Sequence, residues 1–322
     1  MSVAQEGTTV TMLAGGVGGA KLAQGFARLL PDPRLRVVVN TADDFQLYGL
    51  AISPDIDTVT YTLAGIANPA QGWGIAGDTR HTLDAIARLG GESWFLLGDQ
   101  DFATHILRTH RLRQGEALSR ITADFAAALG IGPSIMPMTD QPVATLVDTP
   151  KGRLGFQDYF VARRQTDDVL GVVFDGIEHA EPAPGVLGAL TDADLIVIAP
   201  SNPIVSVGPI LAVSGVRDAL AEATGMRVAV SPIVGGKALK GPADRMLATL
   251  GHEVSALGVA RIYAGLIDLL VIDSIDAALA PHVEALGMGV LVTGTVMGGP
   301  DDRERLASEV LEAGLRSREE RA

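Results

Sequence analysis

Short apolar runs alternate with amphipathic segments along most of the chain. Residues 8–14 form the first run, which enters a glycine-rich turn. From Ala20 onward, apolar side chains recur at i, i+4, i+7 and i+8, which is typical of one buried face of a helix. These side chains are Leu22, Phe26, Leu29 and Leu30. Residues 36–40, which contain three consecutive valines, form the next predicted strand. The order of strand, loop, helix and strand predicts a crossover between parallel strands.

Later apolar runs have the same uninterrupted character, which is typical of strands buried on both faces. They are residues 94–97, 195–199, 228–231, 269–272 and 290–293. Helical patterns separate them. We therefore predict an α/β fold, in which a Rossmann-like, doubly wound and mainly parallel sheet has helices on both faces.

The middle of the chain has a different pattern. Residues 143–148 and 153–161 flank the sequence Thr-Pro-Lys-Gly, which predicts a hairpin, and residues 169–174 could add a third strand. We expect residues 1–60 and 190–315 to form the Rossmann-like nucleotide-binding core. Residues 61–189 would form an inserted lobe of helices and antiparallel strands that helps to build a binding site beside the core.

The composition excludes several classes of function. The net charge is −13 and aromatic residues make up 4% of the chain, which argues against a nucleic-acid-binding surface. A local pocket could still bind a small anion. The absence of cysteine excludes disulfides, iron–sulfur clusters and thiol catalysis. Because no basic signal-peptide region and no apolar run of about 18 residues occurs, we expect a cytoplasmic protein with no membrane partner.

The first glycine loop is the strongest local motif. It consists of Gly15, Gly16, Val17, Gly18 and Gly19, between a predicted strand and a helix, where free N–H groups suit a phosphate. It is not a Walker A motif, because Ala20 precedes Lys21 and Leu22 stands where Ser or Thr would bind magnesium. Lys21 and Asn40 also depart from the dinucleotide-binding pattern. We favour phosphate binding over a tight structural turn.

Lysine is nearly confined to two such loops. The four lysines are Lys21, Lys151, Lys237 and Lys240. Lys237 and Lys240 follow the predicted strand that ends at Ser231, and open α/β sheets bind ligands at the carboxyl ends of their strands. The pattern favours anion binding over chance solvation of the two loops.

Acidic residues gather near the same predicted sheet edge. Asp43 and Asp44 follow the second strand, and Asp55 and Asp57 follow Ser-Pro before a helical segment. Each alone suits a helix cap, but four together also suit a hard cation such as Mg²⁺. The pattern leaves both interpretations open.

Two more polar segments follow apolar runs. One contains Asp99, Asp101 and His105, a pattern that by itself favours a capped helix with a partly buried histidine. The other contains Ser201, Asn202 and Pro203 in a proline-flanked turn. That turn suits either a base or ribose contact or a rigid connection.

Together these segments resemble the 2-phospho-L-lactate transferase family of coenzyme F-420 biosynthesis. The matching stretches run in order from about residue 12 to residue 243. They are LAGGVGGAKL, VVNTADD, SPDIDTVTYTLAG, GWGIAGDT, LLGDQDFATHILR, MPMTDQPVATLV, GFQDYFV, APSNPIVSVGPIL and SPIVGGKALKGPA. The ordered set is specific, although no single stretch is.

The resemblance implies a reaction and a set of partners. The family moves a phospholactyl or phosphoenolpyruvyl unit from a guanosine diphosphate conjugate to a ribityl hydroxyl of the deazaflavin FO, and GMP leaves. A phosphoglyceryl unit is a third possibility, and the sequence does not decide among the three donors. The resemblance further implies Mg²⁺ as cofactor and a homodimer.

The resemblance also assigns residues. The glycine loop would hold the diphosphate, with Lys21 and Lys237 beside it, and Ser201, Asn202 and Pro203 would seat the guanosine. Asp57 and Asp44 would be the leading catalytic or metal-binding acids, with Asp43 and Asp55 beside them. The FO-binding residues would be Asp57, Leu96, Asp99 and His105.

Two alternatives belong to other classes. A non-catalytic regulator that binds nucleotide sugars, of the related gluconeogenesis-factor family, would share the glycine loop and sheet. The SPDIDT and GDQDFATH stretches argue against it. An NAD(P) oxidoreductase is disfavoured by Lys21 and Asn40, as above.

Overall fold

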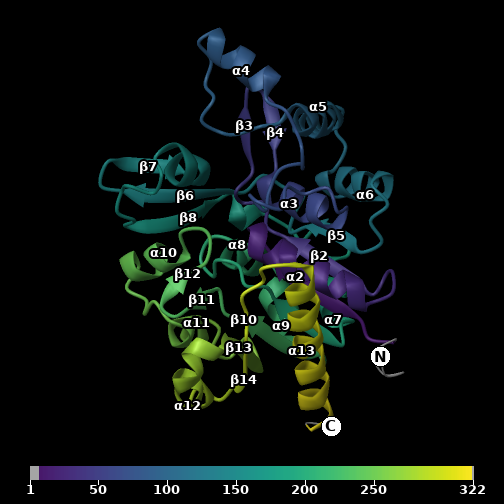
Figure 1. The fold of residues 1–322 in the computed structure, drawn as a ribbon, viewed down its shortest axis with the longest axis vertical. Helices are drawn as coiled ribbons and strands as arrows, with labels where there is room; N and C mark the ends of the chain where they lie inside the picture. Colours follow the sequence, from purple (N-terminus) through teal and green to yellow (C-terminus); the bar gives the residue numbers. More distant parts are fainter. Residues whose placement is uncertain (1–6, 321–322) are drawn as a thin grey trace.

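The computed structural model describes residues 7–320 and contains a seven-stranded parallel sheet in the order β14-β13-β10-β9-β1-β2-β5. Figure 1 shows helices packed around it. The strands are β1 (Val10–Ala14), β2 (Leu35–Val39), β5 (Ser134–Pro137), β9 (Leu195–Ile198), β10 (Met226–Val230), β13 (Leu269–Asp273) and β14 (Gly289–Thr293). The predicted Rossmann-like α/β fold is therefore confirmed.

Both faces of this sheet are covered, which explains the uninterrupted apolar runs. In β1 every residue is buried, and successive side chains point to opposite faces. Leu13 joins one apolar cluster, together with side chains of α7, α9 and α11, whereas Met12 joins the other, together with side chains of α2 and α13. A strand between two helical layers therefore has no polar face.

Twelve α-helices accompany the sheet among residues 7–320. They are α2 (Gly16–Leu29), α3 (Pro54–Leu63), α4 (His81–Arg88), α5 (Asp99–Arg113), α6 (Leu118–Ala128), α7 (Val186–Thr191), α8 (Val207–Ala212), α9 (Val216–Glu222), α10 (Ala243–Thr249), α11 (Ala256–Ile262), α12 (Ala280–Glu284) and α13 (Pro300–Glu319). Among residues 7–320, none is both long and apolar enough to cross a membrane.

The predicted antiparallel piece is present. β6 (Ala144–Thr149) pairs with β7 (Gly152–Gly155) and with β8 (Gly171–Asp175), and all neighbours are antiparallel. The expected second strand is shorter than predicted, because the chain turns into a π-helical segment at Asp158–Ala162. In Figure 1 this small sheet lies beside the main sheet.

The structure corrects two sequence predictions. Residues 94–97 form no strand, because their apolar side chains pack on one another and on Phe45 instead of entering a sheet. Conversely, β5 pairs with β2 in the main sheet although it lies within the range 61–189 that we assigned to the inserted lobe. The lobe is therefore interrupted by a strand of the core.

A second hairpin was not predicted. β3 (Phe45–Leu47) and β4 (Leu50–Ile52) pair through the two-residue turn Tyr48-Gly49. Both turn residues have positive φ, 53° and 73°, as in the type I′ turns that suit the twist of a hairpin. This hairpin projects from the core together with α4, as Figure 1 shows.

The contact between α2 and α13 depends on a glycine. A Cβ atom on Gly25 would lie 2.1 Å from the carbonyl oxygen of Arg303. We expect Gly25→Ala to lower the free energy of unfolding by about 1–3 kcal/mol through overpacking, measured by urea denaturation. Gly188→Ala is the matched control, because Gly188 is an exposed helical glycine whose added Cβ would meet only Asp192 Oδ2, at 3.9 Å. A similar loss in both variants would contradict the packing argument.

Candidate functional site

A cavity of about 690 Å³ opens at the carboxyl ends of the parallel strands. The core contributes the loops that follow β1, β2, β9, β10 and β14. The opposite side comes from the segment 94–97 and from the π-helical segment. The cavity therefore lies where the sheet edge meets the lobe, which is the usual ligand position in open α/β folds.

The glycine loop forms one wall of this cavity. Gly15 and Ser201 are joined twice: the Gly15 N–H donates to Ser201 Oγ at 3.1 Å, and Ser201 Oγ donates to the Gly15 carbonyl at 2.7 Å. A Cβ on Gly18 would lie 2.4 Å from the Pro200 carbonyl oxygen. The loop is thus locked against the turn after β9, and α2 begins there without a side-chain cap. The Gly16 N–H donates to the Asp55 carboxylate, and the other N–H groups of this helix start are suited to an anion.

Most of the predicted donor-side residues line the cavity. They are Gly15, Gly16, Val17, Gly18, Lys21, Ser201 and Asn202. Gly19 and Pro203 do not, and Gly19 instead packs against Ala14 of β1. Asn202 Oδ1 accepts a hydrogen bond from the Ile204 N–H at 2.9 Å, which fixes the turn.

Lys240, and not the predicted Lys237, is the second lysine at the cavity. Lys237 begins the short strand β12 (Lys237–Ala238), where it is exposed and does not line the cavity. Lys240 donates from Nζ to the Gln71 carbonyl oxygen at 2.6 Å. Lys21 donates to the Met297 carbonyl oxygen at 2.9 Å, and burial together with the charges of Arg303 and Lys240 lowers the pKa of Lys21.

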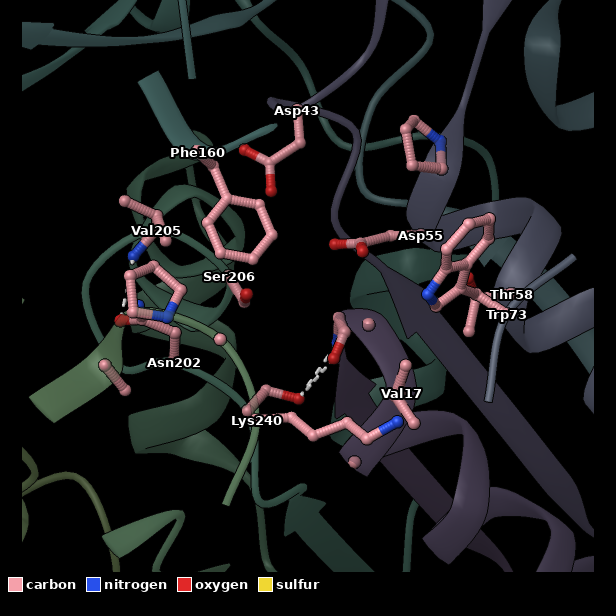
Figure 2. Close-up of a pocket in the computed structure, with 18 of the residues that line it drawn as sticks. Val17, Asp43, Asp55, Thr58, Trp73, Phe160, Asn202, Val205, Ser206 and Lys240 are labelled. Carbon is pink, nitrogen blue, oxygen red and sulfur yellow. Dashed lines mark hydrogen bonds between the residues drawn. The ribbon is translucent and has the colours of Figure 1, made fainter. Parts of the chain in front are cut away.

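The four predicted acids fall into separate environments. Asp43 and Asp55 line the cavity, and Figure 2 shows both carboxylates facing the same open space. Asp44 does not line it, and its Oδ2 accepts a hydrogen bond from Ser53 at 2.6 Å. Asp57 lines the cavity but both of its oxygens accept hydrogen bonds from Arg108, one at 3.0 Å.

Asp43 and Asp55 have the properties of a hard-cation site. Burial raises the pKa of Asp55 to about 6, although hydrogen bonds from Asn40 and from the Gly16 backbone act in the opposite direction. Burial and the charge of Asp55 raise the pKa of Asp43 well above its ordinary value. Asp43 Oδ1 is buried without a hydrogen-bond partner among residues 7–320. Two buried carboxylates at one cavity, one of them with an unpartnered oxygen, fit Mg²⁺.

A second buried group surrounds Asp57. His105 Nδ1 lies 3.6 Å from Asp57 Oδ2, and His105 Nε2 lies 3.3 Å from Asp101 Oδ1. Tyr61 donates its hydroxyl to Asp101 Oδ1 at 2.6 Å. Asp57, Asp101 and His105 could together offer three ligand atoms to a metal. The Arg108 guanidinium already neutralises Asp57, so Asp43 and Asp55 fit a cation better.

The predicted acceptor-side residues are only partly brought together. Leu96 and His105 line the cavity with Asp57, but Asp99 does not. Asp99 instead accepts hydrogen bonds from Thr79 Oγ1 and from the Thr82 N–H, the latter at 2.9 Å, and these contacts lower its pKa. Asp99 therefore caps the first turn of α4.

Sequence reasoning missed the aromatic lining. The cavity holds both tryptophans of the chain and four other aromatic side chains: Trp73, Trp94, Tyr61, Phe95, Phe156 and Phe160. Phe156 and Phe160 are stacked at 5.5 Å between ring centroids. Aromatic residues are scarce in this sequence, so their gathering in one cavity indicates a flat, apolar ligand part.

Comparison with known proteins decides the family. A family model described as 2-phospho-L-lactate transferase CofD matches residues 10–285. The chain belongs to this family. The resemblance found in the sequence is thereby confirmed, in preference to the nucleotide-sugar regulator and the oxidoreductase. The chain is an enzyme that transfers a substituted phosphate group, as expected of the 2-phospho-L-lactate transferase family.

Relatives in this family cover nearly the whole chain. The chain is 43% identical over 309 residues to a phosphoenolpyruvate transferase of Streptomyces griseus, covering 94% of this chain and 97% of that one. It is 39% identical over 302 residues to a 2-phospho-L-lactate transferase of Methanosarcina mazei, covering 94% and 99%. The names of these two relatives specify different groups, phosphoenolpyruvate in one and 2-phospho-L-lactate in the other.

A solved structure has the same fold. It is a member of the UPF0052 family from Bacillus halodurans, with a TM-score of 0.61 over 94% of this chain and 98% of that chain. At 16% sequence identity, this similarity concerns the fold alone.

Proposed function

We propose that the enzyme transfers a phosphoenolpyruvyl, phospholactyl or phosphoglyceryl group from a guanosine diphosphate conjugate to a ribityl hydroxyl of FO. GMP would leave, and the product would be a precursor of coenzyme F-420. The observation that carries this proposal is one cavity that combines a glycine loop, two lysines, buried acids and an aromatic wall. Each part suits a different portion of the two substrates.

The glycine-loop side suits the donor. The start of α2 together with Lys21 and Lys240 opposes the negative charge of a diphosphate. Ser201 and Asn202 lie next to this loop and would contact the guanosine part. The negative net charge of the whole chain makes this local arrangement of cations informative.

We further propose that Asp43 and Asp55 hold Mg²⁺. The unpartnered buried oxygen of Asp43, the place of both carboxylates at the cavity and their raised pKa values support this assignment. When bound, the ion would neutralise charge that develops on the phosphate oxygens. Asp44 would not contact the ion, and would instead hold Ser53 next to α3 by accepting its hydrogen bond.

The lobe side suits the acceptor. The aromatic wall would receive the flat deazaflavin ring, which places a ribityl hydroxyl toward Asp57. That hydroxyl oxygen would attack the phosphorus that carries the acid substituent. The O–H proton would pass to Asp57, and the bond between that phosphorus and the GMP oxygen would break. Positioning and charge neutralisation are the main requirements of such a transfer.

Mass spectrometry of products tests the proposed function. The enzyme is incubated with FO, Mg²⁺ and each of the three guanosine diphosphate conjugates in turn. We expect one conjugate to give the corresponding F-420 precursor together with GMP. If FO is unchanged with all three conjugates, the proposed function is wrong.

The two lysines give a prediction with an internal control. Lys21→Ala and Lys240→Ala should each raise KM for the donor by about tenfold or more, because a hydrogen bond to a charged group contributes about 1.5–3 kcal/mol. KM for FO should change little. Lys237→Ala should leave both constants within about twofold, because Lys237 does not line the cavity. A larger donor effect at Lys237 than at Lys240 would contradict the structural placement.

The homodimer that the resemblance implies stays a prediction. Light scattering on the purified full chain measures it directly.

A further inference from the structure

Arg108 is the largest side chain that is fully buried among residues 7–320. It lies on α5, is 1% exposed, and directs both terminal nitrogens at the carboxylate of Asp57 on α3. It does not line the cavity, whereas Asp57 does. Arg108 therefore bears on the cavity through Asp57, the side chain that both of its terminal nitrogens contact.

We propose that Arg108 is a positioning residue for the acceptor hydroxyl, acting by fixing the orientation of the Asp57 carboxylate. This inference rests on the proposed function, in which Asp57 contacts that hydroxyl. A carboxylate held by the two parallel N–H groups of a guanidinium has one orientation, and its remaining lone pairs point in a defined direction.

A second contact between the same two helices maintains this geometry. Tyr61 lies one turn after Asp57 on α3, and Asp101 lies two turns before Arg108 on α5. The Tyr61 hydroxyl donates to Asp101 at 2.6 Å and lies 2.9 Å from Thr104 Oγ1. The helices are thus joined at two points, Asp57 to Arg108 and Tyr61 to Asp101.

His105 fills the space between these two contacts. It lies one turn before Arg108, it is 1% exposed, and its two ring nitrogens approach Asp57 and Asp101. Arg108 Nη1 also lies 3.4 Å from His105 Nδ1. The imidazole therefore limits rotation of both the Asp57 carboxylate and the guanidinium.

Stability alone does not account for this arrangement. A buried ion pair contributes little net stability compared with apolar side chains of similar volume, because both charges lose their hydration. The pair is placed where one partner faces a cavity and the other is sealed behind it. That placement suits a group whose orientation, rather than its burial, matters for function.

The first test replaces Arg108 by lysine, which keeps the charge but cannot form two parallel hydrogen bonds. Arg108→Lys should lower kcat for transfer to FO by about 100-fold, the loss expected when a reacting group is displaced by about 1 Å. KM for the donor should stay within about twofold. Arg111→Lys is the matched control, because Arg111 lies on the same helix and makes a similar fork with Glu116, and neither of these two residues lines the cavity.

A double-mutant cycle separates positioning from a merely structural role. In the Asp57→Asn background, Arg108→Lys should lower the residual activity by less than about threefold, because no carboxylate remains to be positioned. Residual turnover is measured with excess enzyme over long incubations. Equal losses in both backgrounds, or Arg108→Lys within about threefold of the wild type, would overturn the proposal.

Folding is checked by circular dichroism. If Arg108→Lys does not fold, the neutral pair Asp57→Asn with Arg108→Gln replaces it and is compared with Asp57→Asn alone. Equal activity of these two variants supports the proposal, and a further large loss overturns it. The wild-type enzyme distinguishes a failure of the proposed function from a failure of this inference. If the wild type does not transfer the group to FO, the proposed function is wrong. If the wild type is active and the Arg108 variants are unaffected, only the positioning role of Arg108 is wrong.

Discussion

Replacing Asp57 by asparagine should lower kcat for transfer to FO by about 10²–10³-fold, equivalent to about 2.7–4 kcal/mol for the loss of one preorganised polar group. The reason is that Asp57 is the cavity carboxylate that Arg108 and His105 hold in place at the acceptor side. Steady-state kinetics at saturating donor measures the effect. The melting temperature shows whether the variant is folded.

Asp44→Asn is the informative comparison. Asp44 Oδ2 accepts a hydrogen bond from the Ser53 hydroxyl, which the side-chain oxygen of an asparagine can also accept. Asp44 also does not line the cavity. We expect a loss of less than about tenfold, which corresponds to about 1.4 kcal/mol. If Asp44→Asn were the more damaging of the two, the assignment of the catalytic acid to Asp57 would be wrong.

Removal of Mg²⁺ should abolish measurable donor binding while leaving FO binding nearly unchanged. Without a cation, the acids at the cavity repel a diphosphate, since unit charges 4 Å apart interact by about 4 kcal/mol at an effective dielectric near 20. A divalent ion held by Asp43 and Asp55 would reverse the sign of this interaction. Calorimetry of each substrate with Mg²⁺ and with EDTA measures both affinities.

Variants at the acids locate the ion. Asp43→Asn and Asp55→Asn should each weaken Mg²⁺-dependent donor binding, whereas Asp57→Asn should weaken it much less. Asp84→Asn, at an exposed position of α4, controls for the loss of one negative charge. Donor binding that is equally tight in EDTA would remove the metal from the account and leave Asp43 and Asp55 as structural groups.

The fold could be predicted where each strand has the same surroundings on both faces. β1, β9 and β13 are uniformly buried, so their apolar runs are uninterrupted and easily found. β5 was missed because it is short and ends in a proline, which is rare inside a sheet and was possible here because β5 is an edge strand. Residues 94–97 have the apolar composition of a strand, but they line the cavity as part of its aromatic wall. The strand prediction for them was therefore wrong.

The site was predictable only as far as local sequence determines it. The glycine loop and the acids after β2 directly follow strands that the sequence predicts. Their position at the carboxyl end of the sheet therefore followed from the predicted fold. The choice between Lys237 and Lys240 depends on the β11 (Ile233–Val234) and β12 hairpin, which turns Lys237 outward. The pairing of Asp57 with Arg108 joins residues 51 positions apart, and no pattern within α3 or α5 indicates it.

The most direct test of the central claim uses FO labelled with ¹⁸O in its ribityl hydroxyls. The account predicts that the labelled oxygen bridges FO and phosphorus in the product, and that one unlabelled GMP is released for each FO consumed. Mass spectrometry of both products measures this. Release of GDP in place of GMP, or loss of the label from the product, would contradict attack by the acceptor hydroxyl on the substituted phosphorus.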